Sequence, residues 1–220
     1  MKEWIKKYRH AWVFSYMLLY FAWFFYLEKH VDETFYAVHI RLDDFIPFCE
    51  WFIIPYLIWF PFVAISVLYF FFRNKTEFYR LCAFLFGGMT VCLIIYTIWP
   101  NGQVLRPDLA LLGRDNIAIQ LVQMIHKADT PTNVCPSIHV FNSLAVCIAV
   151  YRSTEFQNKP VVRYITLLTT ISICLSTVFL KQHSAFDGIC AGILALVFTK
   201  LVYSPKFAVA KKKEDCESLS

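Results

Sequence analysis

The sequence is short of charge and lacks the residue spacings of a zinc-binding or secreted domain. Charged residues make up 17% of its 220 residues, and the stretches between apolar runs leave no room for a separate soluble domain. No paired CxxC spacing occurs, which argues against a zinc site. No small-x-small motif ends the first apolar run, so we interpret that run as a retained helix and not as a cleaved signal peptide.

Apolar side chains are what the sequence has in abundance. Hydrophobic residues make up 58% of the chain and aromatic residues 18%, and the mean hydropathy is +0.52. A soluble domain of this size is not so apolar along its whole length, so the composition predicts an integral membrane protein. The expected partner is therefore the bilayer and not a nucleic acid, and the oligomeric state is left open.

Six apolar runs predict an all-α, polytopic bundle of six transmembrane helices in a single membrane domain, residues 1–220. The predicted spans are residues 11–27, 51–72, 81–99, 137–151, 161–180 and 185–203. Residues 204–220 are predicted to be a disordered cytoplasmic tail.

Shorter features lie between and within the predicted spans. Residues 28–50 suggest a short interfacial helix, residues 73–80 a basic turn, and residues 115–126 an amphipathic helix that lies on the bilayer or covers a site. Gly87–Gly88 and the GxxxG step from Gly188 to Gly192 favour close helix packing.

The eight cysteines do not resemble a disulfide framework. Five of them fall inside apolar runs, where cysteine behaves as a small hydrophobic residue. Only Cys49 and Cys135 could meet on the outer side, and whether they pair is left open.

Basic residues are concentrated on one side of the predicted bundle. With the amino terminus inside, the inner segments hold most of the lysines and arginines, and the outer segments hold only Lys29, Arg41, Arg106, Arg114, Lys127 and Lys181. Cytoplasmic loops carry an excess of basic residues, so we predict a multi-pass cell-membrane protein with both termini cytoplasmic. This orientation places Arg106, His139 and His183 on the same extracytoplasmic face.

The most informative stretch runs from Lys181 to Asp187, between two apolar runs. If a helix begins near Ser184, His183 and Asp187 lie one turn apart on one face. A carboxylate there can hold one ring nitrogen and leave the other free to attack. The alternative is a helix cap with a snorkelling lysine, and it weakens because His139 follows Ser137 at the start of another span.

Two histidines with a carboxylate and nearby cations suit phosphoryl transfer. One imidazole can attack phosphorus, the other can protonate the departing alkoxide, and Arg106 and Lys181 can neutralise phosphate oxygens. An esterase would need a positioned serine, and a proton-coupled transporter would place such groups deeper in the membrane. A metal site from His39, Asp43 and Asp44 is conceivable, but a solvated loop face is the favoured interpretation, so neither a metal nor a cofactor is expected.

Two motifs resemble those of the type 2 phosphatidic acid phosphatase superfamily of lipid phosphatases and phosphotransferases. They are Cys135-Pro-Ser-Ile-His139 and Lys181-Gln-His183-x3-Asp187-x4-Gly192. The resemblance implies a bundle of six helices, with His183 as nucleophile, Asp187 as its orienting partner and His139 as general acid. It further implies that Arg106 and Ser137 contact phosphate, and Lys181 is added on its charge and position.

The chain departs from the superfamily pattern at two basic positions. Arg106-Pro107 matches the end of the first motif, but Trp99 stands at its lysine position, and Thr177 stands at the arginine position of the third motif. With Tyr96-x3-Pro100 before the long loop and Lys181-Gln-His183 before the aspartate, the chain is more similar to the inositol phosphorylceramide synthase and sphingomyelin synthase branch. The expected function is an integral membrane, metal-independent phosphatase acting on a lipid phosphate monoester or diphosphate through a phosphohistidine. The alternatives are transfer of a phospho-headgroup to a lipid alcohol, and non-catalytic lipid binding or transport.

Overall fold

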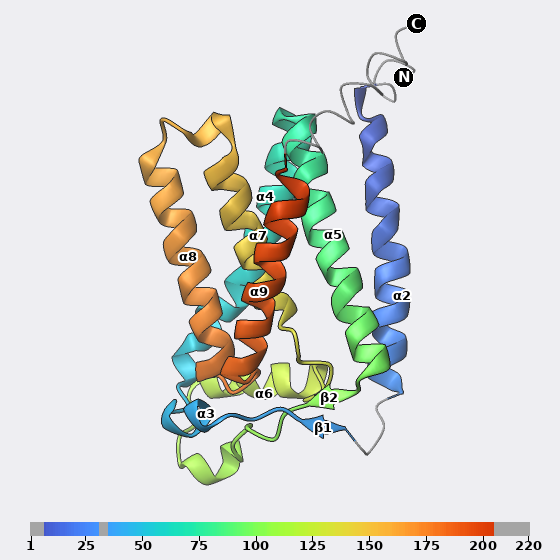
Figure 1. Ribbon diagram of the computed structural model, residues 1–220. Helices are drawn as coiled ribbons and strands as arrows, with labels where there is room; N and C mark the ends of the chain where they lie inside the picture. Colours follow the sequence, from blue (N-terminus) through green and yellow to red (C-terminus); the bar gives the residue numbers. More distant parts are fainter. Residues whose placement is uncertain (1–6, 31–34, 205–220) are drawn as a thin grey trace, which may run out of the picture.

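The apolar runs of the sequence form helices that lie side by side (Figure 1). The computed structural model describes residues 7–30 and 35–204, so the predicted disordered tail lies outside the described residues from residue 205 onward. A 3-10 helix, Arg9–Ser15, leads into the first long helix. The long helices are α2 (Tyr16–Lys29), α4 (Ile53–Arg73), α5 (Lys75–Ile98), α7 (Ile138–Arg152), α8 (Pro160–Phe179) and α9 (Ala185–Val202).

In the described part of the chain, five helical segments are long and apolar enough to cross a membrane. They are Arg9–Lys29, Glu50–Arg73, Lys75–Ile98, Pro160–Phe179 and Ala185–Val202. The expectation of a mostly helical protein is thus confirmed, and five of its helical segments have the length and composition of membrane spans. Helix α7 is shorter, with 15 residues, and at about 1.5 Å per residue it covers roughly 22 Å of a hydrocarbon core about 30 Å thick. A sixth span therefore stays a prediction.

Local capping decides where several helices begin. The predicted basic turn over residues 73–80 is wrong, because only Asn74 separates α4 from α5. The side-chain oxygen of Asn74 accepts a hydrogen bond from the backbone N–H of Glu77 at 3.1 Å and so starts α5 six residues before the predicted span. The predicted amphipathic helix is present as α6 (Ile117–Ala128), with Asn116 as its cap, and the short helix before the second span is α3 (Arg41–Phe45).

The connecting segments gather at one end of the bundle. Strand β1 (Tyr36–Ala37) pairs in parallel with β2 (Asn101–Gly102), and Gly102 also bridges to Thr132. Helices α3 and α6 lie at this same end, opposite the end at which α9 finishes (Figure 1). The strands β1 and β2, helices α3 and α6 and the segments that join them thus form a polar cover over this end of the bundle.

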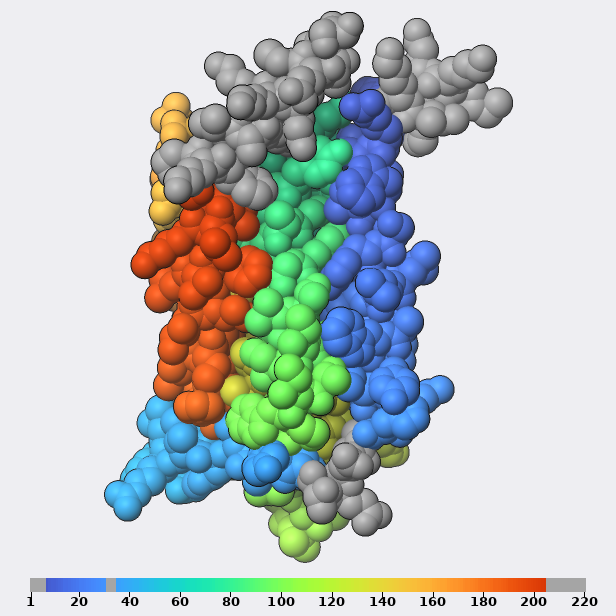
Figure 2. Space-filling view, turned by 45° about the vertical axis from the view of Figure 1, so that its right-hand side comes forward, coloured from blue at the N-terminus to red at the C-terminus, as the bar shows by residue number. Residues whose placement is uncertain are grey.

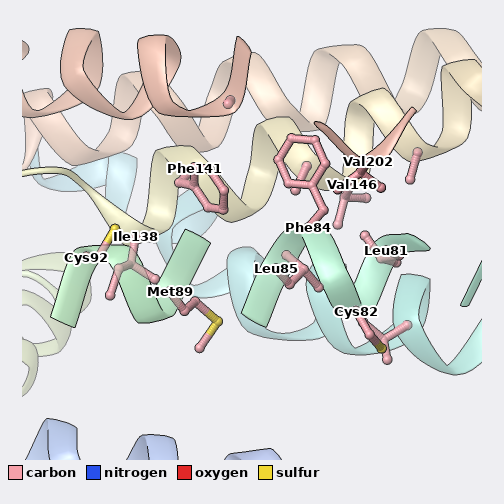
Figure 3. Packing of buried hydrophobic residues seen from close by; sticks show 14 of the residues in the cluster. Leu81, Cys82, Phe84, Leu85, Met89, Cys92, Ile138, Phe141, Val146 and Val202 are labelled. Carbon is pink, nitrogen blue, oxygen red and sulfur yellow. The ribbon is translucent and has the colours of Figure 1, made fainter. Parts of the chain in front are cut away.

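The core lies between α5, α7 and α9, and α2 lies beside α5 on one face (Figure 2). Figure 3 shows Phe84 of α5 and Phe141 of α7 in this core, with ring centroids 5.4 Å apart. At Gly88 an added Cβ would lie 1.9 Å from the Phe141 ring, so this glycine permits the close contact that the sequence suggested. At Gly192 a Cβ would meet no atom within 4 Å, and at Gly188 only one at 3.9 Å, so the GxxxG step does not mark a close contact.

Candidate active site

A cavity of about 630 Å³ extends from the covered end into the bundle. Most of its lining side chains are apolar or aromatic and come from α2, α4 and α5, while polar side chains from the cover close one end. Phe21 of α2 and Phe60 and Leu68 of α4 line the cavity and are also exposed on the outside of the bundle. The cavity therefore opens sideways between α2 and α4, towards the region that lipid would occupy.

His183 lies at the polar end of this cavity, just before α9. Its Nδ1 atom lies 3.0 Å from the backbone oxygen of Val134 and 3.3 Å from Oδ2 of Asp187. Both oxygens only accept hydrogen bonds, so Nδ1 carries the proton and Nε2 is left as the basic nitrogen. Asp187 is held in turn because its Oδ2 accepts the backbone N–H of Ser184 at 2.9 Å. The predicted pairing of His183 with Asp187 on one helical turn is thus present.

His139, in the first turn of α7, faces the same cavity. Its ring centroid is 4.7 Å from that of Tyr56 and 4.3 Å from that of Trp59, both on α4. The ring of His183 is 5.7 Å away. Aromatic packing thus fixes the plane of His139 and presents two imidazoles to one end of the cavity.

A buried asparagine holds the backbone beside His183. The Oδ1 atom of Asn101 accepts the N–H groups of Val134 and Cys135 at 3.0 and 2.8 Å, and its Nδ2 donates to the carbonyl of Cys135 at 3.1 Å. The hydroxyl of Tyr96 donates to the carbonyl of Pro136 at 2.5 Å. The carbonyl of Val134, which accepts a hydrogen bond from His183, therefore belongs to a segment held in place by these bonds. Asn101 makes three of them, and the sequence did not single it out.

Arg106, predicted to contact phosphate, is bound to protein acceptors. Its guanidinium donates to the backbone oxygens of Asp129 and Thr130 at 2.9 and 3.3 Å and to the side chain of Gln182 at 2.6 Å. The Nε atom is buried and has no partner among the described residues. Burial lowers the pKa of Arg106. Arg106 thus connects the segment after α6 to the residue before His183 and does not itself line the cavity.

Ser137 and Lys181, the other predicted phosphate-binding residues, also lie behind the cavity wall. Ser137 is fully buried and caps α7, where its Oγ accepts the N–H of Val140 at 3.4 Å. The amine of Lys181 donates to the backbone oxygen of Asp43 at 2.6 Å. Phosphate binding by these two residues stays a prediction, and in the arrangement described here each has a structural partner.

Two acidic residues that the sequence did not single out also line the cavity. Glu28, at the end of α2, accepts hydrogen bonds from the hydroxyl of Thr130 at 2.6 Å and from the amide of Asn133 at 3.0 Å. Asp129 lies 3.8 Å from Arg106, and burial raises its pKa to about 6. These contacts tie α2 to the segment after α6, and no periodicity in the sequence marks them.

The loop that the sequence offered as a conceivable metal site separates into two environments. His39 and Asp44 form an exposed pair, with Nε2 and Oδ1 2.7 Å apart. Asp43 is 2% exposed, so the interpretation of a solvated loop face is wrong for this residue. Among residues 7–30 and 35–204, no group of three or more His, Cys, Asp or Glu side chains is placed to hold a metal ion. Cys49 and Cys135 are both free thiols.

No protein-family model, curated protein or solved structure matches this chain. The function is therefore inferred from the geometry of the site.

Proposed function

We propose that the protein is an integral membrane phosphatase that hydrolyses a lipid phosphate monoester or diphosphate through a phosphohistidine at the extracytoplasmic face. One observation carries this proposal: two imidazoles face the polar end of a deep apolar cavity that opens sideways from the bundle. An amphiphile could place its chains in the apolar part and its phosphate beside the histidines. The resemblance of the two histidine motifs to the type 2 phosphatidic acid phosphatase superfamily supports the same reaction.

The proposed reaction has two steps with His183 as the attacking group. In the first, Nε2 forms a bond to phosphorus while the bond from phosphorus to the lipid oxygen breaks, and His139 gives a proton to the departing oxygen. In the second, water attacks phosphorus, the P–N bond breaks, and phosphate leaves while His139 takes up the proton of the water. Asp187 stabilises the positive charge that develops on the ring of His183.

The apolar lining of the cavity favours a second candidate in which a lipid alcohol replaces water in the second step. The product would then be a new phospholipid, as the resemblance to the sphingomyelin synthase branch implies. The non-catalytic alternative, lipid binding or transport, takes its support from Arg106 and Lys181, because both cations are bound to protein acceptors.

Purified protein incubated with a panel of radiolabelled lipid phosphates, with and without a lipid alcohol, separates these candidates. Free phosphate from at least one lipid is the expected result. New labelled phospholipid would replace the phosphatase with a transferase, and no turnover of any lipid would leave the non-catalytic alternative.

A matched pair of variants tests whether the cavity binds the lipid. Val63→Trp fills part of the cavity from α4 and should lower kcat/KM for a long-chain lipid phosphate, while leaving that for water-soluble nitrophenyl phosphate close to its original value. Ile58→Trp, on the exposed face of the same helix, is the control. Equal effects of Val63→Trp on both substrates would contradict binding of the lipid in this cavity.

A further inference from the structure

Asp43 is a buried carboxylate on α3, far in sequence from the histidines and outside the cavity wall. Its Oδ2 atom accepts hydrogen bonds from the hydroxyl of Ser184 at 2.6 Å and from the N–H of Ile40 at 2.9 Å. Its Oδ1 accepts the N–H of Ala185 at 2.8 Å. Three hydrogen bonds to one buried carboxyl group closely determine its position.

The partners of Asp43 are the residues that begin α9. Ser184 is the N-cap of that helix, and its Oγ accepts the N–H of Phe186 at 3.1 Å while its own N–H donates to Asp187. Asp43 supplies the acceptor for the N–H of Ala185, which has no acceptor within the helix. The carboxyl group of Asp43 also lies at the amino end of α9, the positive end of the helix dipole. Asp43 thus completes the cap whose other carboxylate, Asp187, faces His183.

Asp43 also holds the chain on the other side of His183. Its backbone oxygen accepts the amine of Lys181 at 2.6 Å. Lys181 has a φ of 56°, in the left-handed region that a non-glycine residue adopts only when its surroundings hold it there. One residue of α3 therefore binds the turn from Lys181 to Ala185 at both of its ends, with His183 between them.

We propose that Asp43 is a positioning residue for His183: it holds the turn that keeps Nδ1 against Val134 and Asp187 and presents Nε2 to the cavity. The proposal rests on the proposed function for its effect on turnover, but the placement of the ring can be measured without turnover. It also gives α3 a role in the site, because the long-range hydrogen bonds of the Asp43 carboxylate within residues 7–30 and 35–204 all go to Ser184 and Ala185.

Kinetics of Asp43→Ala, with Asp44→Ala as the matched control, give the first measurement. Asp44 is the neighbouring carboxylate, but its side chain is 61% exposed and it pairs only with His39 among the described residues. Asp43→Ala should lower kcat on the order of 10²-fold, the cost of displacing a catalytic group by about 1 Å, with a much smaller change in KM. In an Asp187→Asn background the same change should cost far less, because both residues act through His183.

Chemical labelling of His183 gives the second measurement and does not depend on activity. Diethyl pyrocarbonate reacts with unprotonated imidazole, and the rate at each histidine is read by mass spectrometry with His139 as the internal reference. Asp43→Ala should raise the rate at His183 severalfold, and Asp44→Ala should leave it unchanged. Asp43→Asn keeps the shape of the side chain but presents an amide nitrogen that cannot accept from Ser184 or Ala185, so it should act in the same direction if Asp43→Ala fails to fold.

The outcomes separate the two proposals. Unchanged labelling of His183 in the folded Asp43 variants overturns the positioning role, whatever the kinetics show. Absence of turnover in the unaltered protein on every lipid phosphate overturns the proposed function and leaves the labelling result to decide the role of Asp43.

Discussion

Asp187→Asn should lower kcat of the proposed reaction, and the hydrogen bonds of His183 determine how large the loss is. The substitution keeps an oxygen that can accept the N–H of Ser184 and face Nδ1, but it removes the negative charge. In a serine protease triad the equivalent change costs about 10⁴-fold, because the histidine loses its correct tautomer. Here the carbonyl of Val134 lies closer to Nδ1 than Asp187 does, at 3.0 against 3.3 Å, so the proton should stay on Nδ1.

Asp187→Asn therefore removes only the negative charge at the acceptor of the hydrogen bond from Nδ1 of His183. A hydrogen bond to a charged group contributes about 1.5–3 kcal/mol, which at about 1.4 kcal/mol per tenfold corresponds to a loss of roughly 10- to 150-fold in kcat. The assay is phosphate release from the best lipid in the panel at saturating concentration. Asp44→Asn is the control, because it makes the same chemical change in an exposed side chain.

Three results are informative. A loss within the expected range supports the division of labour between the carbonyl of Val134 and the carboxylate of Asp187. A loss near 10⁴-fold, with an unchanged thermal midpoint, would mean that Asp187 alone sets the tautomer and that the reasoning from Val134 is wrong. No loss would show that the carboxylate serves only to cap α9.

Three further predictions follow from the same structure. His139→Ala should lower kcat about 10²–10⁴-fold with a lipid phosphate and far less with nitrophenyl phosphate, whose leaving group needs no proton. His183→Ala should be inactive with both substrates. Equal losses of kcat for the two variants on both substrates would refute their separate roles. Gly88→Ala should lower the free energy of unfolding by about 1–3 kcal/mol through overpacking against the core, measured beside Gly192→Ala, which should change it little. Burial raises the pKa of Asp129 from 3.8 to about 6, so the folded state binds more protons than the unfolded state between these pH values. The thermal midpoint should therefore fall as pH rises through this interval, and Asp129→Asn should remove that fall. The same fall in both proteins would mean that Asp129 does not cause it.

Much of the fold follows from the sequence because its signals are local. Long apolar runs place the membrane-length helices, and the periodic apolar residues of 115–126 place α6 to within a few residues. The pair His183 and Asp187 was also predictable, since it needs only the spacing of one helical turn and a helix beginning near Ser184. Where the local signal was a single capping residue, as at Asn74, the predicted boundary was wrong.

The tertiary structure alone decided which charged and polar residues reach the cavity. Arg106, Ser137 and Lys181 lie near His183 in the fold, but the side chain of each is hydrogen-bonded to the protein, and a motif cannot show where a side chain ends. Asp43 is the opposite case. It looked like one polar residue in a solvated loop, but it is buried against the start of α9, because the chain after β1 places α3 at the covered end of the bundle (Figure 1). Contacts between residues 141 positions apart depend on the path of the whole chain, so no short pattern in the sequence encodes them.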